Sequence, residues 1–94
     1  MTVLRIEHEV ADFEEWKKAF DNDPVDRERS GVRSYRILRP VDDPNFVMID
    51  LEFDSPHEAQ RLLEAMRGIW AGPARSLVSG PRAQIAEHLE GRSY

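Results

Sequence analysis

Residues 12–15 (DFEE) and residues 55–58 (SPHE) carry a shared signature that decides the fold of this chain. In each stretch, a residue that favours the helix N-cap is followed three positions later by glutamate, and an apolar-periodic run begins directly after it. Each stretch also follows a segment in which apolar and polar residues alternate, as they do in a half-buried β-strand. The two stretches therefore predict two strand-to-helix units, one in each half of the chain.

The two predicted helices carry apolar residues at helical spacing. The first helix, at 13–21, places four of them on one face: Phe13, Trp16, Ala19 and Phe20. The second helix, from 56 to about 70, presents a broader apolar stripe: Ala59, Leu62, Leu63, Met66, Ile69 and Trp70. Pro24 is expected to begin an extra helical turn that continues through Arg29 and ends at Ser30-Gly31.

Alternating segments predict four strands. The first three are expected at 3–10, 32–39 and 45–53, and the second and third form a hairpin around a loop with two prolines and two aspartates. After the second helix, a short segment at 74–78 closes at Gly80-Pro81, and the last strand is expected from about 82 to 90.

The order strand, helix, strand, strand, helix, strand predicts an α+β fold, the ferredoxin-like βαββαβ sandwich. In this fold two helices cover one face of a four-stranded antiparallel sheet. The last strand lies beside the first, and the third lies between the first and the second. Period-two alternation assigns the covered face to one set of residues: Leu4, Ile6, Tyr35, Ile37, Val47, Ile49, Leu51 and Ile85.

The other face of the sheet mixes apolar and charged side chains. The alternation leaves four apolar residues uncovered there: Val3, Leu38, Phe46 and Met48. Contiguous uncovered apolar residues are typical of an interface, so a homodimer with its two sheets packed together is predicted. The alternative is a monomer in which this face is wetted.

Length and composition restrict the function classes. The 94 residues are expected to form a single domain, 1–94, with 33% charged and 40% hydrophobic residues. The chain has no cysteine, which excludes a thiolate nucleophile and Cys-ligated zinc. The net charge of −5 disfavours binding to nucleic acid or to an anionic membrane. No signal peptide or membrane span is evident, so a cytoplasmic location is expected.

A few residues are candidates for a ligand site. Trp16, Met66 and Trp70, together with His8 and Tyr35, are expected near one another between sheet and helices, where they would suit a flat aromatic ligand. The alternatives are that the aromatic residues are core and that His8 is a hydrogen-bonded structural residue. Arg36 and Asp50 are expected to form a cross-strand ion pair. No histidine or carboxylate spacing indicates a metal site, and no hydrolase motif is present.

The length, the two strand-helix units and the passage at 70–73 (WAGP) resemble the dimeric α/β-barrel superfamily, and within it the small antibiotic biosynthesis monooxygenase-like proteins. The resemblance implies a pocket between sheet and helices, a barrel formed across a dimer, and cofactor-independent oxidation of polycyclic aromatic compounds. Related haem-degrading enzymes use an Asn on the first strand, a Trp near the second helix and a downstream His. Only Trp70 matches, because 3–10 contains no Asn and 74–78 contains no His, which argues against haem degradation.

The resemblance suggests roles for the candidate residues without any cofactor. In an oxygenase, His8 or Tyr35 would assist proton abstraction, and Trp16 and Trp70 would form the walls of the pocket. Arg36 would stabilise an anionic intermediate if its side chain turns toward the site. The competing hypothesis is a non-catalytic module that binds a small molecule or another protein.

Overall fold

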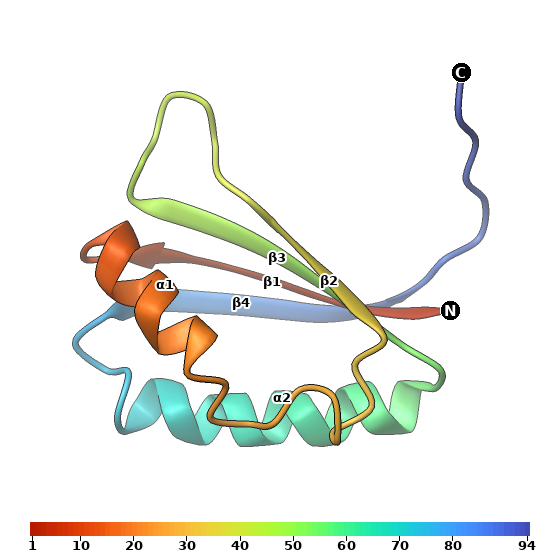
Figure 1. The fold of residues 1–94 in the computed structure, drawn as a ribbon, viewed down its shortest axis with the longest axis horizontal. Helices are drawn as coiled ribbons and strands as arrows, with labels where there is room; N and C mark the ends of the chain where they lie inside the picture. The colour runs from red at the N-terminus through yellow and green to blue at the C-terminus, as the bar shows by residue number, and fades with distance from the viewer.

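The helices and strands follow the order that the two helix-start signatures predict (Figure 1). The structure is a computed structural model that describes residues 1–94. Its elements are β1 (Thr2–Val10), α1 (Phe13–Asp21), β2 (Ser34–Leu38), β3 (Phe46–Phe53), α2 (Pro56–Ala71) and β4 (Val78–Glu87). The fold is therefore the ferredoxin-like βαββαβ sandwich, as predicted.

The sheet has the strand order β2-β3-β1-β4, and every neighbouring pair is antiparallel. Leu4 pairs with Leu51 and Ile6 with Ile49, so the residues assigned to one face do lie on one face. Both helices cover this face, and α2 runs along the sheet (Figure 1). The opposite face carries no helix and is called the open face below.

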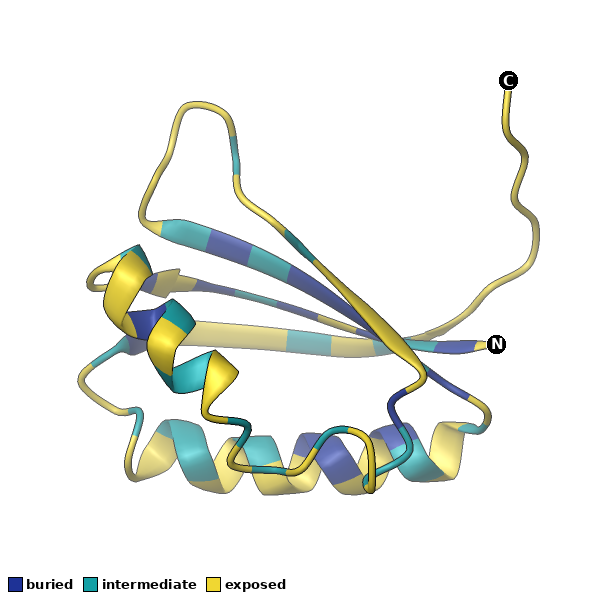
Figure 2. Cartoon of the chain, viewed as in Figure 1, coloured by how far each residue is buried: buried dark blue, intermediate teal, exposed yellow.

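The core lies between the covered face and the helices. Along β1, side chains alternate strictly between buried and more exposed positions, and Leu4 and Ile6 are at most 1% exposed. Helix α2 contributes Ala59, Leu62 and Leu63 to the same core, while most of β2 and β4 stays exposed (Figure 2). Tyr35 belongs to the covered side but is 47% exposed, because β2 is an edge strand.

Both predicted helix caps are present. The Asp12 side chain accepts a hydrogen bond from the Glu15 backbone N–H at 3.0 Å. Ser55 Oγ accepts one from the Glu58 N–H at 3.3 Å and donates to Glu58 Oε1 at 3.2 Å. These bonds satisfy N–H groups that have no partner within the helix, so local sequence determines where each helix begins.

The predicted helical turn at 24–29 is wrong. The chain between α1 and β2 consists of turns, and Asp23 and Asp26 have φ angles of 52° and 50°. This left-handed backbone conformation is incompatible with a right-handed helix. Short polar side chains such as aspartate tolerate it better than most.

The last strand begins at Val78, four residues before the predicted start. Gly80 and Pro81 lie within β4, where the pairing register shifts between Glu7 and Glu9 of β1. Gly80 has φ 59°, a conformation that glycine adopts without strain at a β-bulge. Pro81 is tolerated because β4 is an edge strand. The Gly-Pro pair is therefore a bulge and does not end the segment before it.

Neither α1 nor α2 has the combination of length and apolarity that a membrane-spanning helix requires.

Candidate functional site

A cavity of about 70 Å³ lies between the covered face of the sheet and the two helices. Of its 16 lining residues 14 are hydrophobic, and the other two are Pro24 and Arg27. Its walls include the predicted pocket residues Trp16, Met66 and Trp70, together with others such as Phe20 and Leu62. The apolar lining suits an uncharged or aromatic group.

His8 contacts both tryptophans of this cavity without itself lining it. Its ring centroid lies 5.8 Å from that of Trp16 and 6.3 Å from that of Trp70, in edge-to-face arrangements. The side chain comes from the covered face of β1 and is 1% exposed. His8 therefore packs against the two tryptophan side chains of the cavity wall without lining the cavity itself.

The protonation state of His8 follows from this packing. Burial lowers the pKa of His8 below its ordinary value of 6.5, and the bond to the Glu9 carbonyl opposes this shift only in part. Nδ1 lies 3.1 Å from the Glu9 carbonyl oxygen. Because a carbonyl can only accept, Nδ1 carries the proton and Nε2 presents a lone pair. At neutral pH the imidazole is uncharged and Nε2 can act as a base.

Tyr35 and Arg36 do not line the cavity. The Tyr35 ring packs against Phe20, with centroids 5.1 Å apart, and lies beside a surface groove. Arg36 lies on the open face, where its Nη2 donates to Asp50 Oδ2 at 3.2 Å. The predicted Arg36–Asp50 ion pair is confirmed, and it keeps the guanidinium on the far side of the sheet from the cavity.

Asp50 is the centre of a charge cluster on the open face. Arg5 Nε donates to Asp50 Oδ1 at 2.8 Å and Arg5 Nη2 donates to Oδ2 at 3.0 Å, in addition to the bond from Arg36. The hydrogen bond from Arg5, with that from Arg36, holds the pKa of Asp50 below its ordinary range in spite of burial. A groove of about 790 Å³ on this face is bounded by these side chains and the segment after β4.

Arg27 is the one charged residue of the cavity lining, and sequence reasoning missed it. It lies in the turns between α1 and β2, in the segment where the extra helical turn was predicted. An irregular loop has no periodicity from which a side chain's direction can be read. Asp23 and Asp26 lie close to Arg27 in the sequence, so an ion pair could be expected. The same mixture of charges is equally typical of a solvated loop.

The structure contains no group of three or more His, Asp or Glu side chains that could hold a metal ion. His57 lies in the first turn of α2, His88 follows β4, and both are exposed. The side chains that the structure brings together between sheet and helices are those of the cavity wall, including Arg27, and His8.

The sequence matches no protein-family model and no curated protein. Solved structures are similar over nearly the whole chain. The cofactor-independent oxygenase SnoaB from Streptomyces nogalater has a TM-score of 0.75 at 18% identity, covering 96% of this chain and 94% of that one. The haem degrader MhuD from Mycobacterium tuberculosis, with two haems bound in its active site, has a TM-score of 0.73 at 19% identity, covering 99% and 100%.

A protein from Nitrosomonas europaea described as a candidate antibiotic biosynthesis monooxygenase has a TM-score of 0.73 at 20% identity, covering 96% of this chain and 100% of that one. At these identities the similarity establishes the fold and not the activity. The chain therefore has the fold of the antibiotic biosynthesis monooxygenase-like proteins, as the resemblance of its sequence predicted.

Proposed function

We propose that this protein binds a small aromatic molecule in the cavity between sheet and helices and oxidises it with molecular oxygen, without a cofactor. The observation that carries the proposal is the cavity itself, lined by 14 hydrophobic residues and walled by Trp16 and Trp70, with a neutral His8 against both rings. The fold similarity to SnoaB, a cofactor-independent oxygenase, supports the same reading.

Oxidation without a cofactor requires a substrate that supplies its own electrons. An aromatic compound with an acidic CH₂ group, such as a hydroxyanthrone, meets this need because loss of a proton leaves a carbanion that the rings stabilise. The carbanion transfers electrons to oxygen. In the net reaction the CH₂ group loses two hydrogens and gains one oxygen atom as a ketone, and the second oxygen atom leaves as water.

His8 is the proposed base. Nε2 has a lone pair and makes no hydrogen bond within the protein, and the lowered pKa keeps the ring neutral at pH 7. Because His8 does not line the cavity, substrate would reach Nε2 only after Trp16 or Trp70 shifts. The predicted roles of Tyr35 and Arg36 are not used here. Arg36 is bonded to Asp50 on the open face and Tyr35 packs on Phe20, whereas His8 contacts both tryptophans of the cavity wall.

Entry of a ring also requires the cavity to enlarge. At about 70 Å³ it is smaller than the roughly 150 Å³ dry cavity that admits benzene in other proteins. Met66 is half-buried at the wall and has an unbranched, flexible side chain, so it is the residue expected to move.

Intrinsic fluorescence provides the first test, because the chain has two tryptophans and both line the cavity. Titration with hydroxylated aromatic compounds is expected to change the emission, and Ala19→Leu, which fills the cavity from α1, should weaken binding at least about tenfold. Ala65→Leu is the matched control, since Ala65 is exposed on α2. Equal binding by wild type and Ala19→Leu would place the ligand elsewhere.

The catalytic part is tested with an oxygen electrode. Wild-type protein should consume oxygen in the presence of a hydroxyanthrone above the uncatalysed rate, and a folded His8→Gln variant should not. Binding without oxygen uptake would favour the second candidate, a non-catalytic binding module. That alternative is supported by the absence of His8, the proposed base, from the cavity lining.

We also propose a homodimer that packs through the open face. Leu38 is 43% exposed there, and Phe46 and Met48 are partly exposed close to it. Val3 is partly exposed farther along the same face, beyond the cluster of Arg5, Asp50 and Arg36. Contiguous apolar residues on a sheet face favour burial against a second sheet.

A further inference from the structure

Arg27 is the single charged residue among those that line the cavity. Its side chain is 15% exposed, and it also borders the surface groove that contains Asp23 and Tyr35. Arg27 therefore lies where the apolar cavity meets the surface. A charged group at such a position costs free energy unless something pairs with it.

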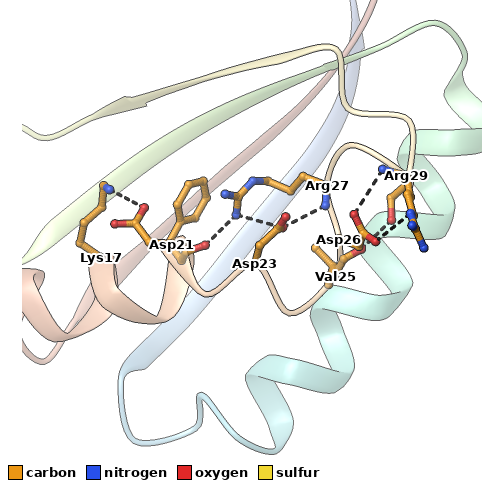
Figure 3. Close-up of polar contacts among 9 residues, drawn as sticks. Lys17, Asp21, Asp23, Val25, Asp26, Arg27 and Arg29 are labelled. Carbon is orange, nitrogen blue, oxygen red and sulfur yellow. Dashed lines mark hydrogen bonds and ion pairs between the residues drawn. The ribbon is translucent and has the colours of Figure 1, made fainter.

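The guanidinium of Arg27 is held in place on several sides. Its Cζ lies 3.9 Å from the centroid of the Phe20 ring and 5.1 Å from that of Tyr35, both as cation–π contacts. Nη1 donates to the Phe20 carbonyl oxygen at 2.8 Å and lies 3.4 Å from Asp23 Oδ1. Figure 3 shows the side chain lying between α1 and the turn at Asp23. The group is therefore oriented before any ligand arrives.

Part of the hydrogen-bonding capacity of Arg27 is unused. A guanidinium has five N–H donors, and the hydrogen bond and the ion pair of this side chain both involve Nη1. Nε and Nη2 have no partner within the protein. Of the other acidic residues nearby, Asp21 pairs with Lys17 and Asp26 pairs with Arg29 (Figure 3), while Glu28 borders the surface groove. Asp23 is the one carboxylate within ion-pair distance of Arg27.

We propose that Arg27 determines substrate specificity, by binding the acidic oxygen of an aromatic carboxylate or phenolate whose ring enters the tryptophan cavity. The Nε and Nη2 edge matches a carboxylate with two parallel hydrogen bonds, and a phenolate with one or two. This proposal rests on the proposed function, because it names the substrate class of the same site. In this proposal Arg27 stabilises the bound anion. The sequence suggested that role for Arg36, which lies on the open face.

Benzoate and benzamide test the proposal, because they have nearly the same size and shape and differ in charge. Their affinities are measured by titrating the tryptophan fluorescence. Wild-type protein is expected to bind benzoate at least about tenfold more tightly than benzamide, as a charge-assisted pair implies. Arg27→Gln should remove this preference by weakening benzoate alone, while benzamide affinity changes less than about twofold.

Arg29→Gln is the matched control. It removes one positive charge from the same loop, but Arg29 is 89% exposed and does not line the cavity. The control should keep the preference for benzoate. If Arg29→Gln abolishes the preference as fully as Arg27→Gln does, long-range charge and not a contact is responsible, and the proposal fails.

The outcomes separate this proposal from the proposed function. If neither compound binds the wild type, the aromatic site fails and the specificity of Arg27 fails with it. If both bind the wild type equally, the aromatic site stands and the role of Arg27 is overturned. Should Arg27→Gln not fold by circular dichroism, Arg27→Lys takes its place. It keeps the charge but not the planar fork, and it should reduce the preference severalfold.

Discussion

His8 is buried between Trp16 and Trp70, so its protonation is linked to the stability of the fold. Its pKa is lowered in the folded state, whereas in the unfolded chain it is near 6.5. Below pH 6.5 the unfolded state therefore binds more protons than the folded state. The free energy of unfolding should be constant with respect to His8 above this pH and fall as pH drops toward the folded-state pKa.

Urea denaturation at a series of pH values between 7.5 and 5 measures this loss, in a range above that in which carboxylates titrate. His8→Gln should flatten the pH dependence, since the substituted side chain does not titrate. His57→Gln is the control, because His57 is exposed on the first turn of α2 and its replacement leaves His8 intact. An identical pH dependence in wild type and His8→Gln would contradict the prediction.

Two arginines show which side-chain positions can be read from sequence. Arg36 lies on a strand, and period-two alternation together with the hairpin loop placed it opposite Asp50, where it is found. Arg27 lies in a loop, and its direction depends on the backbone of Asp23 and Asp26 and on packing against Phe20. In a regular element the periodicity determines the direction of a side chain, whereas in a loop the direction depends on the particular backbone angles and contacts of that loop.

At the level of secondary-structure elements, replacing glycine by alanine should change the stability of the protein in opposite directions at Gly31 and at Gly68. Gly31 has φ 100°, and a Cβ there would lie 2.5 Å from Glu58 Oε2 at the start of α2. Gly31→Ala is therefore expected to destabilise the protein by about 1–3 kcal/mol. Gly68 lies inside α2 with no atom within 4 Å of an added Cβ. Gly68→Ala should stabilise by about 0.5–1 kcal/mol.

Thermal or urea unfolding of the two variants beside the wild type provides the measurement, and each variant serves as the control for the other. If Gly31→Ala is as stable as the wild type, the loop before β2 must adopt another conformation, in which the added Cβ does not meet the Glu58 side chain. The result bears on the site, because this loop also carries Arg27.

The elements differ in how well local sequence defines them. The starts of α1 and α2 were predicted to the residue, because a cap side chain and the N–H that it accepts from are three positions apart. The start of β4 was misplaced by four residues, because Gly80-Pro81 reads as a turn in isolation. Pairing with β1 converts it into a bulge, and that pairing is not visible in the local sequence.

At the scale of the molecule, the open face predicts self-association. Wild-type protein is expected to sediment as a dimer in analytical ultracentrifugation. Phe46→Asp should weaken the dimer by at least about tenfold, since it would bury a carboxylate beside Glu9, its partner across the strand pair. Val41→Asp is the control, because Val41 is fully exposed in the loop between β2 and β3. A wild-type monomer at all concentrations would refute the proposal.

The sequence by itself determined the order of the elements, the helix starts, the covered face of the sheet and the cross-strand pair of Arg36 with Asp50. These features depend on periodicity, capping and pairing rules that act over short distances along the chain. Tertiary structure alone decided that Tyr35 stays at an exposed edge, that His8 lies behind the tryptophans, and that Arg27 reaches the cavity. The physical reason is that a cavity is the space left when distant elements pack, so its lining depends on all of them together.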